Sequence, residues 1–132
     1  SRVPVVVGCA RCTWREPQQP PLSPMQLMAE TARMAVEDAA ADVDLMPHVR
    51  TVACVSGGPP GDMATVLWPN QPASLAKALG IDASVHHQRC RGGDGPQGTT
   101  TLMAQRIASG HVGTEGLILL SGAMAANTLT GV

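Results

Sequence analysis

Four short apolar runs constrain the fold of this chain more than any other feature of its sequence. They read VPVVVG, RTVACVSGG, SVHHQRC and EGLILLSGA, at residues 3–8, 50–58, 84–90 and 115–123. Short runs of aliphatic and β-branched residues that end near glycine are typical of strands buried on both faces of a sheet. Each run therefore predicts a strand, and SVHHQRC, the least apolar of the four, is the weaker strand candidate.

Segments with helical punctuation separate these runs. Residues 23–26, Ser-Pro-Met-Gln, have the form of a capping box with proline at the first helical position, so a helix is predicted from there to about Ala41. Residues 72–80 open with proline and close with glycine, and residues 96–109 lie between a proline and Gly110. Strands that alternate with helices predict an α/β domain with a mainly parallel sheet and helices on both faces.

Composition and charge narrow the function. The chain has 132 residues, of which 44% are hydrophobic and 14% charged, which suits one soluble globular domain with one core. A net charge of -1 with scattered arginines gives no basic surface, so we expect no nucleic-acid partner. No apolar run approaches the roughly 20 residues that span a bilayer, so we expect no membrane span and an intracellular protein.

The cysteines and histidines leave three interpretations open. Cys54 lies within an apolar run and is expected to be a buried free thiol. Zinc could be held by thiols and imidazoles of Cys9, Cys12, His86, His87 and Cys90. Adjacent histidines on a strand point to opposite faces, so only one of the two joins Cys90 easily. We therefore predict no metal site and favour surface residues without a metal, with a redox role for the Cys-x-x-Cys pair as the third interpretation.

The stretch HHQRCRGGDGPQG at residues 86–98 combines a cysteine, two histidines and several glycines ahead of a predicted helix. It could cradle a phosphate, because amides at a helix N-terminus bind anions, but neither dinucleotide nor P-loop motifs are present. The glycines are better explained as turn residues, with Asp94 or Gly95 capping the helix and Pro96 in its first turn.

The order of these elements resembles the first half of the N-terminal domain of the thiolase superfamily. The matching stretches are VPVVVG, PASLAKALGI, GGDGPQ, AQRIASGH and LILLSGAM, and they extend over nearly all 132 residues. The resemblance is to thiolase-like proteins of the acetyl-CoA acetyltransferase type. It implies that residues 1–132 are a partial thiolase-like N-terminal domain, and that the remainder of the fold is not in this sequence.

The resemblance also implies where a nucleophile would stand. Active thiolases carry a cysteine at the entrance to the helix, and matching the helix motif places that position at Gly92 or Gly93. Cys90 is the nearest thiol, two or three residues early, and is the candidate for a displaced nucleophile. The family's acidic residue near the last strand is replaced by Met124. The substrate-binding residues implied are Gly92, Gly93, Asp94 and Gly95, whose amides would face the acyl pocket.

Two functions follow from the resemblance. One is a thiolase-superfamily enzyme that acts on acyl-CoA thioesters by acyl transfer or carbon-carbon cleavage, including a cysteine-independent aldolase with a partner subunit. The other is an inactive thiolase-like scaffold or acyl-CoA-binding subunit of a larger complex. Both imply coenzyme A thioesters as substrate or ligand, no other cofactor, and the cytoplasm or an organelle of fatty-acid metabolism as location.

The resemblance implies an assembly as well. In the family the strand before the glycine loop pairs across a twofold axis, which here is the strand at 84–90. We therefore expect a homodimer or a larger assembly in which His86 or His87 faces the partner.

Overall fold

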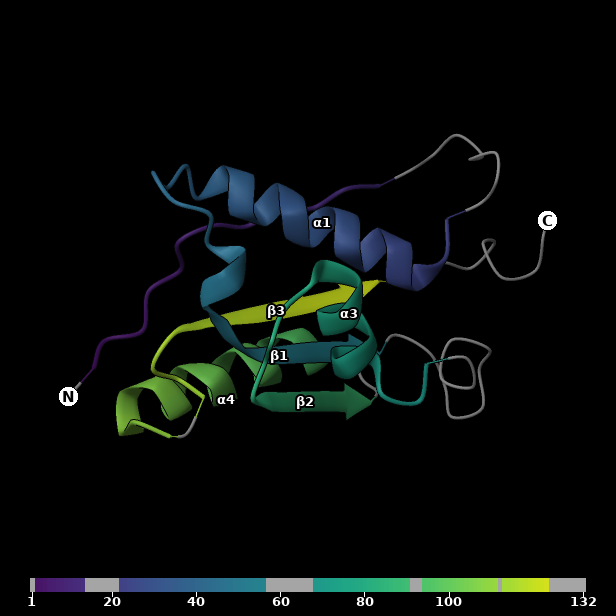
Figure 1. Ribbon diagram of the computed structural model, residues 1–132. Coiled ribbons are helices and arrows are strands. Elements are labelled where there is room, and N and C mark those ends of the chain that lie inside the picture. Colours follow the sequence, from purple (N-terminus) through teal and green to yellow (C-terminus); the bar gives the residue numbers. More distant parts are fainter. Residues whose placement is uncertain (1, 14–21, 57–67, 91–93, 112, 124–132) are drawn as a thin grey trace.

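Parallel strands form a sheet with helices on both of its faces (Figure 1). The computed structural model describes residues 2–13, 22–56, 68–90, 94–111 and 113–123. In chain order the elements are α1 (Pro24–Asp38), the 3-10 turn η1 (Met46–His48), β1 (Val49–Ser56), α3 (Gln71–Leu79), β2 (Val85–Cys90), α4 (Gly95–Ser109) and β3 (Leu117–Ala123). The predicted α/β class with a mainly parallel sheet is confirmed.

The strand order is β2-β1-β3, with β1 in the centre. Val52 of β1 has His86 of β2 and Leu119 of β3 as its Cα partners. The central place of β1 fits its sequence, because Val52, Ala53 and Cys54 are completely buried. A strand covered on both faces and paired along both edges needs apolar residues in its middle, as β1 has at Val52, Ala53 and Cys54.

The two faces of the sheet are covered by different helices. Helices α1 and α3 contact each other and share a core cluster that includes Met28, Leu75 and, from β1, Val52 and Cys54. Side chains alternate along a strand, so Val55 points to the opposite face, where it meets the start of α4. In Figure 1, α1 and α3 lie on one side of the sheet and α4 on the other.

The predicted helix signals act as expected. The Ser23 hydroxyl accepts a hydrogen bond from the Gln26 amide, and the Gln26 side chain accepts one from the Ser23 amide, which completes the capping box of α1. Helix α3 begins one residue earlier than predicted, because the Asn70 side chain caps it by accepting from Ala73. Gly80 and Gly110 end α3 and α4 in the left-handed conformation.

The prediction of a strand at residues 3–8 is wrong. These residues belong to no strand, and the side chains of Val3 and Val6 are 79% and 81% exposed. The segment instead touches the end of α1, where the Cys9 amide donates to the Asp38 carboxylate at 2.9 Å. An apolar run indicates a tendency to be buried, but it does not show which strand the run would pair with. Both edges of the central strand β1 are already paired, with β2 and with β3.

Candidate functional site

The carboxyl ends of the strands meet at one edge of the sheet. Ser56, at the end of β1, has Cys90 of β2 and Ala123 of β3 as its Cα partners. The chain passes from β1 to β2 on one side and then crosses to β3 on the other side of β1. In α/β sheets, ligands bind beyond the carboxyl ends of the strands at such a reversal. This edge, between β1 and β3, is therefore the candidate site.

Helix α4 begins at the same edge. Its first residue, Gly95, is buried, and a Cβ added there would lie 3.0 Å from Cγ1 of Val55. The Gly98 amide donates to the carbonyl oxygen of Asp94 at 2.8 Å, so it is the first amide engaged within the helix. The amides of Gly95 and Gln97 precede it and have no intrahelical acceptor, while Pro96 has no amide hydrogen. These two amides and the positive end of the helix dipole favour the binding of an electron-rich oxygen at this end of α4.

The residues predicted to form the site are spread over strand, loop and helix. Cys90 is the last residue of β2, and nothing is described of its side chain. Gly92 and Gly93 lie outside the described residues. Asp94 stands at the N-cap position of α4 without a capping hydrogen bond from its side chain, and Gly95 is the first helical residue. The sequence therefore located the start of α4 correctly, whereas the roles of these residues stay predictions.

Thr99, which the sequence did not single out, lies one turn into α4 on the same side of the helix as Gly95. Its side chain is fully buried, and its Oγ1 atom has no hydrogen-bond partner. The next hydroxyl, on Thr100, donates to the Pro96 carbonyl at 2.8 Å. Three consecutive threonines at 99–101 were the available signal, because one member of such a run must face the sheet.

The thiols differ sharply in environment. Cys54 is completely buried, and its burial raises the pKa of the thiol to about 12, so it is protonated at neutral pH and cannot act as a nucleophile. Cys9 and Cys12 are exposed and free, on the segment before α1. Within the described ranges, no three histidine, cysteine, aspartate or glutamate side chains gather where they could hold a metal ion.

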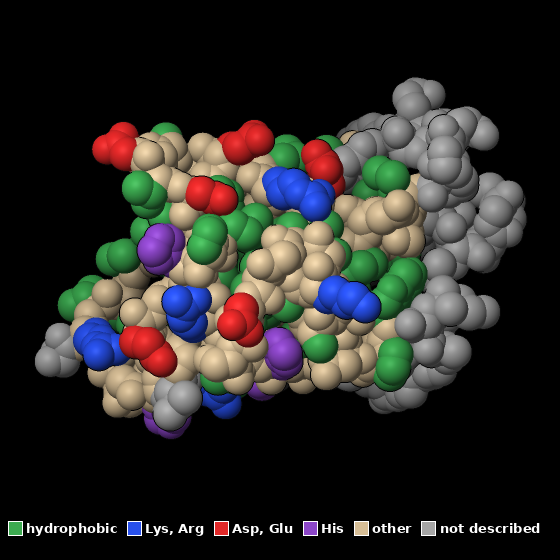
Figure 2. Space-filling model, in the orientation of Figure 1, with side chains coloured by type: hydrophobic (Ala, Val, Ile, Leu, Met, Phe, Trp, Pro, Cys, Tyr) green, Lys and Arg blue, Asp and Glu red, His purple; other side chains and the backbone are tan. Residues whose placement is uncertain are grey.

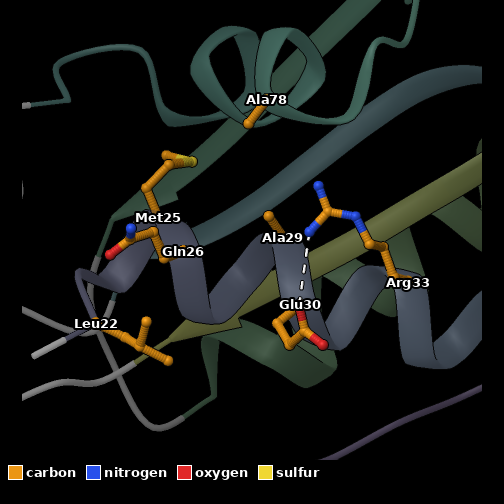
Figure 3. Close-up of a pocket in the computed structure, with 7 residues that line it drawn as sticks. All are labelled: Leu22, Met25, Gln26, Ala29, Glu30, Arg33 and Ala78. Carbon is orange, nitrogen blue, oxygen red and sulfur yellow. Dashed lines mark ion pairs between the residues drawn. The ribbon is translucent and has the colours of Figure 1, made fainter. Parts of the chain in front are cut away.

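A hollow of about 460 Å³ lies on the other face of the domain, between α1 and α3 (Figure 3). Its lining residues are Leu22, Met25, Gln26, Ala29, Glu30, Arg33 and Ala78. The only charged groups among them, Glu30 and Arg33, form an ion pair at 3.6 Å and leave no net charge for a ligand to match. Because α1 and α3 lie on one face of the sheet and α4 on the other, the hollow is separate from the start of α4.

Charged side chains of both signs are mixed on the visible surface. Figure 2 shows acidic and basic side chains interspersed over the face it presents, without an extended area of one sign.

Across the described residues, no helix is long and apolar enough to cross a membrane.

Comparison with known proteins gives a structural likeness. No family model and no curated protein matches the sequence. The structure is similar to the crystal structure of a monomeric SCP2-thiolase-like protein type 1 from Mycobacterium smegmatis, with a TM-score of 0.74 and 28% sequence identity. The likeness covers 95% of this chain and 24% of that protein, so the chain spans about a quarter of its length. The parallel sheet with its flanking helices is therefore a fragment of a thiolase-like fold, and the likeness supports a relationship to the thiolase superfamily.

Proposed function

We propose that this chain is the first part of a thiolase-superfamily protein that binds acyl-CoA thioesters, with the start of α4 at the acyl end of the site. The observation that carries the proposal is the structural likeness, because it extends over nearly the whole chain at 28% identity. The position of α4 adds independent support, since the amides of its first turn lie at the edge where α/β sheets bind ligands. On this proposal residues 1–132 are a partial N-terminal domain.

The chemistry that this arrangement can supply is electrostatic. A thioester carbonyl oxygen gains negative charge when its carbon is attacked or when the α-carbon loses a proton. Amides of the first turn of α4 would donate to that oxygen, and the positive end of the helix dipole would stabilise the charge. The step would be acyl transfer or carbon-carbon cleavage, and its acids, bases and nucleophile would come from residues outside the described ones.

Cys90 is a poor candidate for the nucleophile on this proposal. It ends β2, whereas the amides that would stabilise a thiolate belong to α4, which starts at Gly95. The second candidate function, an inactive scaffold or acyl-CoA-binding subunit, is favoured by the glycines at 92 and 93, where the resembling family carries its cysteine.

The test uses the intact protein with two measurements. Calorimetric titration with acetyl-CoA and with free coenzyme A should show tighter binding of the thioester, because only the thioester offers a carbonyl oxygen to α4. Thiolysis of acetoacetyl-CoA should be unchanged in Cys90→Ser. Binding without turnover would favour the scaffold, and loss of turnover in Cys90→Ser would favour covalent transfer through Cys90. If neither ligand binds, the proposal is wrong.

A further inference from the structure

Cys9 and Cys12 form a pair of thiols whose chemistry the proposed function does not use. Both side chains are exposed and free, whereas Cys54 is buried, with the pKa of its thiol raised to about 12. Thiol–disulfide exchange requires an accessible thiolate. Exchange in the described part of the chain is therefore expected at residues 9 and 12 and not at residue 54.

The backbone around these thiols can bend. Residues 2–13 belong to no helix or strand, so bending them breaks no sheet or helix hydrogen bond. Three residues of extended chain span about 10 Å. The Cα atoms of a disulfide are roughly 4.4–6.8 Å apart, so the pair can join only if the backbone turns at Ala10 and Arg11.

The backbone at Cys9 lies against α1. A Cβ on Gly8 would overlap the Ala35 carbonyl oxygen, so the backbone there lies directly against the last turn of α1. The Cys9 amide donates to the Asp38 carboxylate at 2.9 Å. Among the described residues no such hydrogen bond is found for Cys12, and its side chain is exposed. Cys12 can thus swing towards a Cys9 backbone that is fixed on α1.

We propose that Cys9 and Cys12 are a disulfide modification site that exchanges with low-molecular-weight disulfides such as glutathione disulfide. The thiolate of one cysteine attacks a sulfur of glutathione disulfide, its S–S bond breaks, and one glutathione leaves and takes up a proton. The second cysteine thiolate then attacks the protein sulfur of the mixed disulfide. The Cys9–Cys12 bond forms, and a second glutathione leaves and takes up the other proton. Two electrons pass from the cysteines to glutathione disulfide.

A disulfide suits this pair better than a metal. Within the described residues no third cysteine, histidine or carboxylate joins the two thiols in a group that could hold an ion. The nearby Asp38 carboxylate already accepts the Cys9 amide. The two thiols also lie close enough along the chain for the second step to be intramolecular, which favours ring closure over a lasting mixed disulfide.

The site can be tested on the intact protein because trypsin cleaves after Arg11, between the two cysteines. The protein is equilibrated with reduced and oxidised glutathione, quenched in acid, alkylated with N-ethylmaleimide in denaturant so that Cys54 is accessible, digested and analysed by mass. In oxidising mixtures, the peptides ending at and starting after Arg11 should stay joined until dithiothreitol is added. The Cys54 peptide should carry N-ethylmaleimide at every ratio.

Two variants make the outcome decisive. Cys12→Ser cannot close the ring and should keep glutathione on Cys9, while Cys54→Ser should behave as the wild type. The proposal is overturned if wild-type Cys9 and Cys12 stay free in oxidising mixtures, or if both keep glutathione. It is equally overturned if either one pairs with Cys90, which the joined tryptic peptides reveal, or with a second copy, which the mass of the undigested protein reveals.

Discussion

At the residue scale, Thr99 shows how a buried polar atom can oppose stability. Its hydroxyl is enclosed and without a hydrogen-bond partner, a situation that costs about 1–3 kcal/mol. We expect Thr99→Val, which keeps the shape and removes the hydroxyl, to raise the free energy of unfolding by about 1 kcal/mol. Urea unfolding measures this change. Thr99→Ser keeps the hydroxyl and should show no gain, and a less stable valine variant would mean that the hydroxyl has a partner after all.

Cys54 predicts a dependence of stability on pH. Its thiol has a pKa of about 12 in the folded chain against 9.0 as the ordinary value. Below pH 9 the thiol is protonated in both states, so it has no effect. Above pH 9 the unfolded chain loses the proton while the folded chain keeps it, so stability falls as pH rises towards about 12. The slope is at most about 1.4 kcal/mol per pH unit.

Urea unfolding of the wild type and of Cys54→Ala at about pH 8 and about pH 10 measures this slope. The alanine variant should lose less stability over the interval than the wild type, because it lacks the titrating thiol. Parallel losses in the two proteins would show that Cys54 does not carry the effect.

At the scale of elements, two glycines allow the cost of backbone strain alone to be compared with the cost of strain plus steric crowding. Gly80 ends α3 at φ 69° with nothing near the place of a Cβ, so Gly80→Ala should cost about 1 kcal/mol. Gly113 precedes β3 at φ 85°, where a Cβ would lie 2.5 Å from Cγ2 of Val85. Its carbonyl also accepts the Thr51 hydroxyl at 2.8 Å.

We therefore expect Gly113→Ala to cost about 3 kcal/mol or more, since strain, crowding and a displaced hydrogen bond add together. Thermal unfolding of both variants compares the two costs. Equal costs at Gly80 and Gly113 would mean that the chain around residue 113 relaxes around the added methyl group.

The helices and strands were predictable to the extent that their signals are local. The capping box at Ser23 and the glycine at position 110 are signals that need no distant partner. Helix α1 begins at the capping box, and α4 ends at Gly110. Residues 3–8 failed because an apolar run does not show which strand it pairs with. The contact between Gly95 and Val55 joins positions far apart in the sequence, so no local pattern reveals it. The candidate site could be located at the start of α4, but its geometry could not.

At the scale of the whole molecule, assembly through β2 stays a prediction. Strand β2 is an edge of the described sheet, and His86 on it is exposed. We expect a dimer at neutral pH in which His86 or His87 faces the partner. Light scattering of the intact protein, with His86→Asp and His87→Asp as comparison, measures it. The similar M. smegmatis protein is described as monomeric, and a monomer here at neutral pH would end this prediction.

The pairing of β1 with β3 has a consequence for how the chain acquires its structure. Thr51 and Gly113, which are hydrogen-bonded beside these strands, are separated by 62 positions. Contacts between distant positions slow folding, because a long loop must close before they form. During synthesis β1 and β2 leave the ribosome well before β3. Until β3 follows, the hydrogen-bonding groups along one edge of the central strand β1 have no partner strand. Aggregation competes with folding during that interval, and slower translation beyond residue 90 would lengthen it.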